Sequence, residues 1–317
     1  MSVLSKAEGL PAVMPGSVSD RLAKRRSRHI KERLIEFSLF LAALVSVATT
    51  VAIVLVLLTE SFLFFTKVSL WDFLTDTQWT PLFADAHYGI LPLLSGTLVS
   101  SLIALAVAIP LGTIIAIYLS EFAPFTVREI AKPFLELLGG IPTIVYGYFA
   151  LLFVTPLLQA IFPSLPGFNL LSAGIVMGIM IIPYVSSVSE DAMRAVPMSL
   201  REGSYAMGAT RFQTAVRVVT PAAFSGIAAA YILGISRAVG ETMILAVAAG
   251  TQPNLTWNPM DSAATITSYI VQVALGDLPH GSLAYQTIFA AGLTLCLLTL
   301  AFNVIGHLLR KRYRQAY

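Results

Sequence analysis

Two ionisable residues, Arg237 and Glu241, lie four positions apart in the otherwise apolar stretch ISRAVGETMILAVAAG, residues 235–250. A guanidinium stays charged at any physiological pH, and its rigid fork of donors matches the oxygens of a phosphate-like anion. A carboxylate four positions further on a helix can pair with it. The two residues therefore predict either an anion-binding site or an internal ion pair.

The sequence lacks the residue patterns of common enzyme sites. None of its six lysines follows a glycine, which excludes a Walker-type nucleotide loop. Its four histidines are scattered, and its single cysteine, Cys296, lies in an apolar run. No Cys/His set has metal-ligand spacing, and no intrachain disulfide can form. We therefore expect no catalytic activity, cofactor or metal site in this chain.

The elements that must position the two charges are membrane helices. The chain is 56% hydrophobic and only 12% charged, outside the range of an ordinary soluble domain. A spanning helix needs about 20 mostly apolar residues. Six such runs occur, without strand-like alternation, at about 38–65, 90–119, 133–158, 170–188, 222–249 and 287–309. We predict an all-α polytopic membrane protein with six transmembrane helices.

The distribution of charge predicts its orientation and organisation. Seven Lys or Arg lie in residues 21–33, and further Lys and Arg follow the second, fourth and sixth apolar runs. The positive-inside rule then places both termini in the cytoplasm, and the net charge of +3 indicates topology and lipid attraction rather than nucleic-acid binding. Trp71, Trp79 and Trp257 fall in the outer loops, as interfacial or docking aromatics would. The expected parts are a disordered basic cytoplasmic tail at 1–35, a first transmembrane helix at 36–66, an outer loop at 67–89, a five-helix core at 90–309 with a cytoplasmic loop at 190–221, and a basic cytoplasmic C-terminus at 310–317.

The cytoplasmic loop contains signals for two short helices. Ser199 and Glu202 have the spacing of a capping box, as do Thr210 and Gln213. Gly208, between them, suits the left-handed position that ends a helix. The loop is either a solvated hairpin or an element that inserts into the groove of a partner.

This loop resembles the cytoplasmic signature of ABC importer permeases, E-A-A-x-x-x-G followed nine residues later by I-x-L-P. Glu202, Gly208 and Pro221 match it at the right spacing, whereas Gly203 and Ser204 replace the alanines, Val218 replaces isoleucine and Thr220 replaces leucine. In that family the loop forms coupling helices that sit in a cleft of a separate ATPase subunit. The resemblance therefore implies that the following residues contact an ATPase: Glu202, Gly203, Ser204, Gly208, Val218 and Pro221.

Three further stretches are similar to permeases of the phosphate-uptake (PstC) type: ELLGGIPTIVYGYF at 136–149, IMIIPYVSSVSEDAM at 179–193, and SRAVGETMILAVAAG at 236–250. The resemblance runs from about residue 71 to residue 309. It implies an ABC importer permease fold in the bacterial inner membrane, forming half of a phosphate pathway. The implied partners are a second permease of the PstA type, an ATPase dimer that binds ATP and Mg²⁺, and a periplasmic phosphate-binding protein.

On one continuous helix over 222–249, Arg237 and Glu241 would share a face with small residues. We expect Arg237 to attract the anion, Glu241 to hold the guanidinium, and Thr143 and Tyr146 to add hydroxyls to the pathway. A structural ion pair that only fixes helix register is the alternative. Sulfate, molybdate or tungstate could replace phosphate. A self-sufficient carrier or channel, with Glu241 coupling protons, also stays open, although the capped hairpin favours an ATPase-driven permease.

Overall fold

The computed structural model describes residues 18–312, with side chains for residues 32–308, 310 and 311. The predicted tail at 1–35 and C-terminus at 310–317 therefore lie partly outside the described residues. Residues 18–312 are mostly helical and contain no β-strand beyond an isolated bridge between Trp79 and Tyr88. The predicted all-α class is confirmed.

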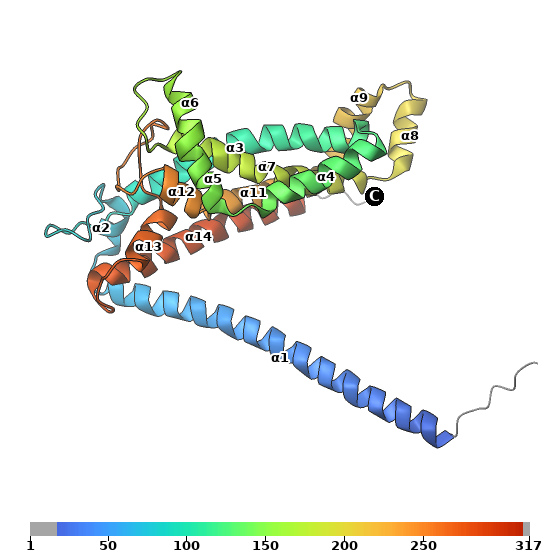
Figure 1. Ribbon diagram of the computed structural model, residues 1–317, viewed down its shortest axis with the longest axis horizontal. Helices are drawn as coiled ribbons and strands as arrows, with labels where there is room; N and C mark the ends of the chain where they lie inside the picture. The colour runs from blue at the N-terminus through green and yellow to red at the C-terminus, as the bar shows by residue number, and fades with distance from the viewer. Residues whose placement is uncertain (1–17, 313–317) are drawn as a thin grey trace, which may run out of the picture. The chain divides into compact units, whose positions relative to one another are not determined.

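The chain divides into two units, residues 1–56 and 57–317, which are described separately. The described part of the first unit consists of the helix α1 (Val18–Phe65), which continues into the second unit (Figure 1). Its apolar part runs over Glu32–Phe65, close to the expected first transmembrane helix. The helix itself begins at Val18, so it does not start at the predicted boundary near residue 36.

Among the described residues, four helices are long and apolar enough to cross a membrane: Glu32–Phe65, Leu91–Phe122, Leu170–Arg194 and Leu283–Leu308. Two further candidates are helix pairs, bent by 88° between Phe125–Gly140 and Thr143–Gln159 and by 73° between Arg211–Ala222 and Phe224–Val239. The predicted number of six is reached only if each bent pair is one span. The third and fifth apolar runs are thus not straight helices.

Three helices of the second unit form its centre: α3 (Leu91–Ile117), α7 (Leu170–Arg194) and α11 (Phe224–Val239) lie side by side (Figure 1). Gly174 and Gly178 allow α7 to approach α3 closely. A Cβ at Gly174 would lie 2.7 Å from Cβ of Ile103, and one at Gly178 would lie 2.7 Å from Cβ of Val107. This close packing provides a rigid frame for the polar residues that α7 and α11 carry near their ends.

The loops that we predict to lie outside the membrane fold around a second apolar cluster, which includes residues of α2 (Leu70–Thr75) and α13 (Ile266–Ala274). Trp79 is only 1% exposed, with its ring edge-to-face against Phe73 and Tyr269 at centroid distances of 6.1 and 5.1 Å. The prediction of an interfacial or docking role for Trp79 is therefore wrong. An indole buries more apolar area than most side chains, which explains why Trp79 lies in this apolar cluster and not on the surface.

The loop at 67–89 is also held by His87, whose Nδ1 lies 2.8 Å from Oδ2 of Asp76. This hydrogen bond raises the pKa of His87, because the imidazolium form gains a carboxylate partner. The polar contact and the aromatic cluster together give this loop a defined structure.

Candidate functional site

The hairpin formed by α8 (Met198–Ala206) and α9 (Arg211–Thr214) stands at one end of the second unit (Figure 1). Gly208 joins the two helices with φ at +82°, as predicted. The capping box of Thr210 and Gln213 is confirmed, since each backbone N–H donates to the other's side chain at 2.9 and 3.2 Å. The second helix and the turn therefore follow the local sequence.

The predicted capping box of Ser199 and Glu202 is wrong. Pro197 occupies the N-cap position of α8, which begins at Met198 without a side-chain cap. The fixed φ of proline starts the helix before Ser199, which leaves that hydroxyl inside the first turn. The carboxylate of Glu202 is instead on the exposed surface of the hairpin.

The motif residues lie on this hairpin and just after it. Four of them are exposed (Glu202, Gly203, Gly208 and Pro221), and two are half-buried (Ser204 and Val218). The hydroxyl of Ser204 lies 2.9 Å from the hydroxyl of Thr214. Large apolar side chains are exposed beside them, among them Met207 at 88%. Exposed apolar side chains of this size, clustered on a short projecting element, are typical of a surface that a partner covers.

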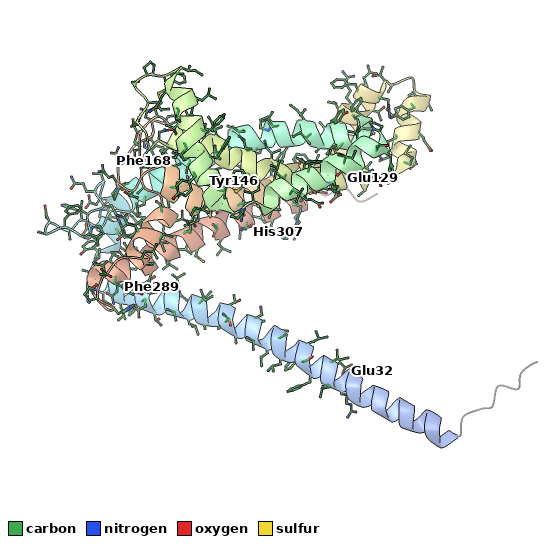
Figure 2. The ribbon with its side chains drawn as sticks, viewed as in Figure 1. Glu32, Glu129, Tyr146, Phe168, Phe289 and His307 are labelled. Atoms are coloured by element: carbon green, nitrogen blue, oxygen red, sulfur yellow. The ribbon has the colours of Figure 1, made fainter. Side chains whose placement is uncertain are left out.

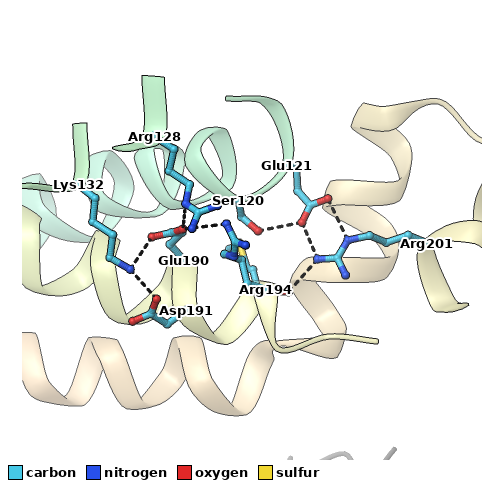
Figure 3. A network of polar contacts seen from close by, with 9 residues as sticks. Ser120, Glu121, Arg128, Lys132, Glu190, Asp191, Arg194 and Arg201 are labelled. Atoms are coloured by element: carbon cyan, nitrogen blue, oxygen red, sulfur yellow. Dashed lines mark hydrogen bonds and ion pairs between the residues drawn. The ribbon is translucent and has the colours of Figure 1, made fainter. Parts of the chain in front are cut away.

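A buried ion pair anchors the hairpin to the helical core (Figure 3). Arg201, only 8% exposed, donates from Nη2 and Nε to the two carboxylate oxygens of Glu121 at 2.8 and 3.2 Å. Its guanidinium also donates to the carbonyls of Val196 and Met193 at 2.6 and 2.9 Å. One side chain of α8 therefore connects the π-helical turn that follows α3 with the end of α7.

A second buried charge, Glu190, lies one turn before the end of α7 (Figure 3). Its carboxylate is fully buried and faces three cations: Arg128 Nε at 3.1 Å, Lys132 Nζ at 3.2 Å and Arg194 Nη1 at 3.8 Å. Lys132 also lies 2.7 Å from Asp191. A carboxylate buried this deeply requires such compensation, so the cluster ties α4 (Phe125–Gly140) to α7.

Sequence reasoning did not identify these two clusters. By sequence, the basic residues after the second and fourth apolar runs indicate only the orientation of the protein, and these include Arg128, Lys132, Arg194 and Arg201. The available signal was the presence of Glu121 and Glu190 at the ends of apolar runs, where a carboxylate needs a partner.

The predicted continuous helix over 222–249 is wrong, because α11 ends at Val239 and a separate helix, α12 (Met243–Ala248), follows. Gly240 is the C-cap of α11, and Thr242 precedes α12 with φ at −117°. Glycine and a β-branched residue both disfavour helix, which explains the interruption inside an apolar run. The predicted common helical face of Arg237 and Glu241 therefore does not exist.

Arg237 and Glu241 do not form an ion pair in the described structure. Glu241 is buried, and its Oε1 accepts the backbone N–H groups of Met243 and Ile244 at 3.2 and 3.4 Å, at the start of α12. The guanidinium of Arg237 is exposed, with Cζ 5.4 Å from the ring centroid of Tyr184 and Nη2 4.0 Å from the sulfur of Met180. The described contacts of Arg237 are thus with polarisable groups, which leave its charge available to an anion.

Tyr146 lies on α5 (Thr143–Phe149), which follows the 88° bend after α4 (Figure 2). Its hydroxyl donates to the carbonyl of Leu138 at 2.7 Å, and the hydroxyl of Tyr184 donates to the carbonyl of Gly139 at 3.2 Å. Thr143 opens α5 and is half-buried. Among the described contacts none joins Arg237 to Thr143 or Tyr146, whereas Tyr184 links Arg237 to the bend.

Comparison with known proteins places the chain among transport components. The family described as binding-protein-dependent transport system inner membrane component matches residues 108–315. The chain is 37% identical to a probable ABC transporter permease, YqgH of Bacillus subtilis, over 93% of this chain and 96% of that protein. It is 32% identical to the phosphate transport system permease PstC of Xylella fastidiosa, with 76% and 79% covered, and 33% identical to PstC of Mesorhizobium japonicum, with 76% and 78% covered.

Solved structures show the same fold at low sequence identity. An importer of the acidic polysaccharide alginate contains a chain with a TM-score of 0.65 and 17% identity, over 92% of this chain and all of that one. The methionine transporter MetNI, in an inward-facing conformation, matches with a TM-score of 0.53 and 19% identity, over 72% of this chain and 95% of that one.

Proposed function

Because this chain belongs to the family of binding-protein-dependent transport inner membrane components, as an ABC importer permease of the PstC type, we propose that it is the permease subunit of an ATP-driven phosphate importer. It is a multi-pass protein of the cytoplasmic membrane. Its relatives are permease components and not catalytic subunits, so ATP hydrolysis is assigned to a separate subunit. We assign it half of the translocation pathway.

The observation that supports phosphate most directly is the similarity to permeases named PstC over about three quarters of the chain. The chemistry of Arg237 is compatible with that substrate. An exposed guanidinium whose described neighbours are an aromatic ring and a thioether can present its fork of donors to a tetrahedral oxyanion. Sulfate, molybdate or tungstate could accept hydrogen bonds from the same guanidinium donors. The assignment to phosphate therefore depends on the similarity to permeases named PstC.

We assign Arg237 to anion attraction and Tyr184 to positioning its guanidinium. Glu241 acts indirectly, because its carboxylate caps α12 and helps to hold the break after α11. Thr143 and Tyr146 belong to the α4–α5 bend beside this region. Tyr146 stabilises the bend with its hydroxyl and does not offer that group to the anion in this conformation.

The proposed partners follow from the family and from the hairpin surface. The α8–α9 hairpin is assigned to a cleft of an ATPase dimer, to which ATP and Mg²⁺ bind. A second permease of the PstA type would complete the pathway, and a periplasmic phosphate-binding protein would deliver the substrate. A solved alginate transporter with a chain of the same fold, at a TM-score of 0.65, is in complex with a substrate-bound periplasmic protein, which supports this arrangement.

The energy source tests the proposed function. In vesicles that contain the whole complex, we expect phosphate uptake to require internal ATP and to persist after the proton gradient is collapsed. A non-hydrolysable ATP analogue serves as the matched control and should not support uptake. Uptake by this chain alone, driven by a proton gradient, would contradict the proposal and support the secondary carrier.

The glycine turn of the hairpin tests its coupling role. Gly208→Val places a β-branched side chain at φ +82°, a strain of about 1–3 kcal/mol. We expect normal insertion into the membrane but roughly tenfold less co-purified ATPase, because the strain displaces the docking surface. Gly203→Ala is the control, because alanine is the residue that the signature carries at this position and its Cβ meets nothing within 4 Å in this chain. If both variants retain the ATPase equally, the turn does not position the contact.

A further inference from the structure

A basic pocket of about 480 Å³ lies where the end of α14 (Leu283–Arg312) meets the start of α11. Among the residues whose side chains the structure describes, Ser225, His307, Arg310 and Lys311 line it. None of them belongs to the hairpin, to the buried ion clusters or to the region of Arg237. The described lining therefore brings two positive charges together without a carboxylate, a combination that favours binding of an anion.

Contacts within the pocket determine what it can donate. Nη2 of Arg310 lies 3.2 Å from Nδ1 of His307. A guanidinium can only donate, so Nδ1 of His307 accepts and its ring proton lies on Nε2. Ser225, in the first turn of α11, adds a hydroxyl at a helix start that has no side-chain cap. The pocket thus offers donors from the following groups: the Arg310 guanidinium, the Lys311 ammonium, the His307 Nε2–H and the Ser225 hydroxyl.

The pocket lies at the end of the apolar part of α14, where we expect the phosphates of the lipid headgroups. In the sequence the apolar run of α14 ends at Leu309, and Arg310 and Lys311 follow it directly. On α14, Leu297, Leu300, Val304 and Leu308 are spaced by three or four residues, so they form one stripe, and all four are exposed. His307 and Lys311 lie seven residues after Leu300 and Val304, on the same side of the helix. An apolar stripe therefore leads directly to the cationic pocket.

We infer that this pocket binds the phosphate group of an anionic phospholipid, with an acyl chain along the stripe of α14. A free phosphate ion would satisfy the donors but would leave the stripe without a role. Basic pockets between transmembrane helices at the membrane surface suit anionic headgroups. The inference does not depend on which substrate the complex transports.

The test uses the full-length chain, purified with its partner subunits in detergent and titrated with dioleoyl-phosphatidylglycerol or dioleoyl-phosphatidylcholine. Bound lipid is counted by native mass spectrometry. We expect wild-type protein to prefer phosphatidylglycerol. The double variant Arg310→Gln/Lys311→Gln should bind it about 30-fold more weakly, since each basic residue near the membrane contributes about a factor of five. The double variant Arg33→Gln/Lys67→Gln removes the same charge outside the pocket, at the ends of the first apolar helix, and should keep the preference for phosphatidylglycerol over phosphatidylcholine.

Two further measurements test whether binding requires the positive charges and whether the bound phosphate group belongs to a lipid or to a free ion. Arg310→Lys/Lys311→Arg keeps both charges and should retain most of the affinity, which separates lost charge from misfolding. Inorganic phosphate at millimolar concentration should not displace the lipid. Equal binding of the two lipids, or undiminished phosphatidylglycerol binding by the Arg310→Gln/Lys311→Gln variant, would overturn the inference. Arginine-dependent binding of inorganic phosphate without lipid binding would overturn the lipid assignment.

Discussion

Replacing Arg237 with glutamine is expected to reduce phosphate uptake by roughly 10- to 100-fold while the complex still assembles. Glutamine keeps much of the side-chain bulk and can still hydrogen-bond, but it removes the charge that the anion requires. The range corresponds to the loss of one charge-assisted hydrogen bond. Uptake of labelled phosphate, together with the yield of co-purified ATPase, measures transport and assembly separately.

The structure separates the roles of Arg237 and Glu241 in a way that single variants can test. Glu241 caps α12 through Oε1, and glutamine retains an oxygen acceptor at that position. Glu241→Gln should therefore impair transport much less than Arg237→Gln does. Glu241→Leu removes the acceptor and should destabilise the protein by about 1 kcal/mol, seen as a lower melting temperature.

The double variant Arg237→Gln/Glu241→Gln decides between an anion site and a structural pair. If the two charges compensated each other in another conformation, each single neutralisation would strand a charge, and the double variant would recover transport. We expect no recovery, because no guanidinium would remain to attract the anion. Arg33→Gln, the same change on the first helix, is the control and should leave uptake unchanged.

Much of the helical architecture was predictable because it depends on local patterns. Apolar runs of about 20 residues predict membrane helices whatever their neighbours are. Gly208 and the pair of Thr210 and Gln213 determine the turn and the start of α9 through their own backbone groups, so the sequence was sufficient there. Features whose cause lies within a few residues can be inferred in this way.

Other features depend on local competition or on distant partners, which composition does not show. The break between α11 and α12 lies inside an apolar run, so hydropathy does not change where Gly240 and Thr242 end one helix and precede the next. The pairing of Arg201 with Glu121 joins residues 80 positions apart. The burial of Trp79 likewise depends on Tyr269, far along the chain. Spacing within one segment cannot predict these contacts.

The long-range pair of Arg201 and Glu121 leads to the second large effect, since replacing Arg201 with methionine should detach the hairpin from the core. Glu121 would remain buried, and among its described polar partners only the Ser120 hydroxyl would be left. The carbonyls of Met193 and Val196 would lose the guanidinium donor. Breaking a buried pair on one side costs about 3–5 kcal/mol. We expect a lower melting temperature and loss of most co-purified ATPase. Arg217→Met, an exposed arginine nearby, should change neither.

The double variant Glu121→Met/Arg201→Met separates the stability of the pair from its positioning role. Removing both charges leaves no stranded carboxylate, so the melting temperature should recover toward wild type. The two carbonyls at the end of α7 would still lack the guanidinium that connects them to α8, so the hairpin would remain loosely placed. We therefore expect restored membrane yield but continued loss of the ATPase. If the double variant regained the ATPase together with stability, the Arg201 guanidinium would matter only as the partner of a buried charge. The packing of the two hairpin helices would then be sufficient to position the hairpin.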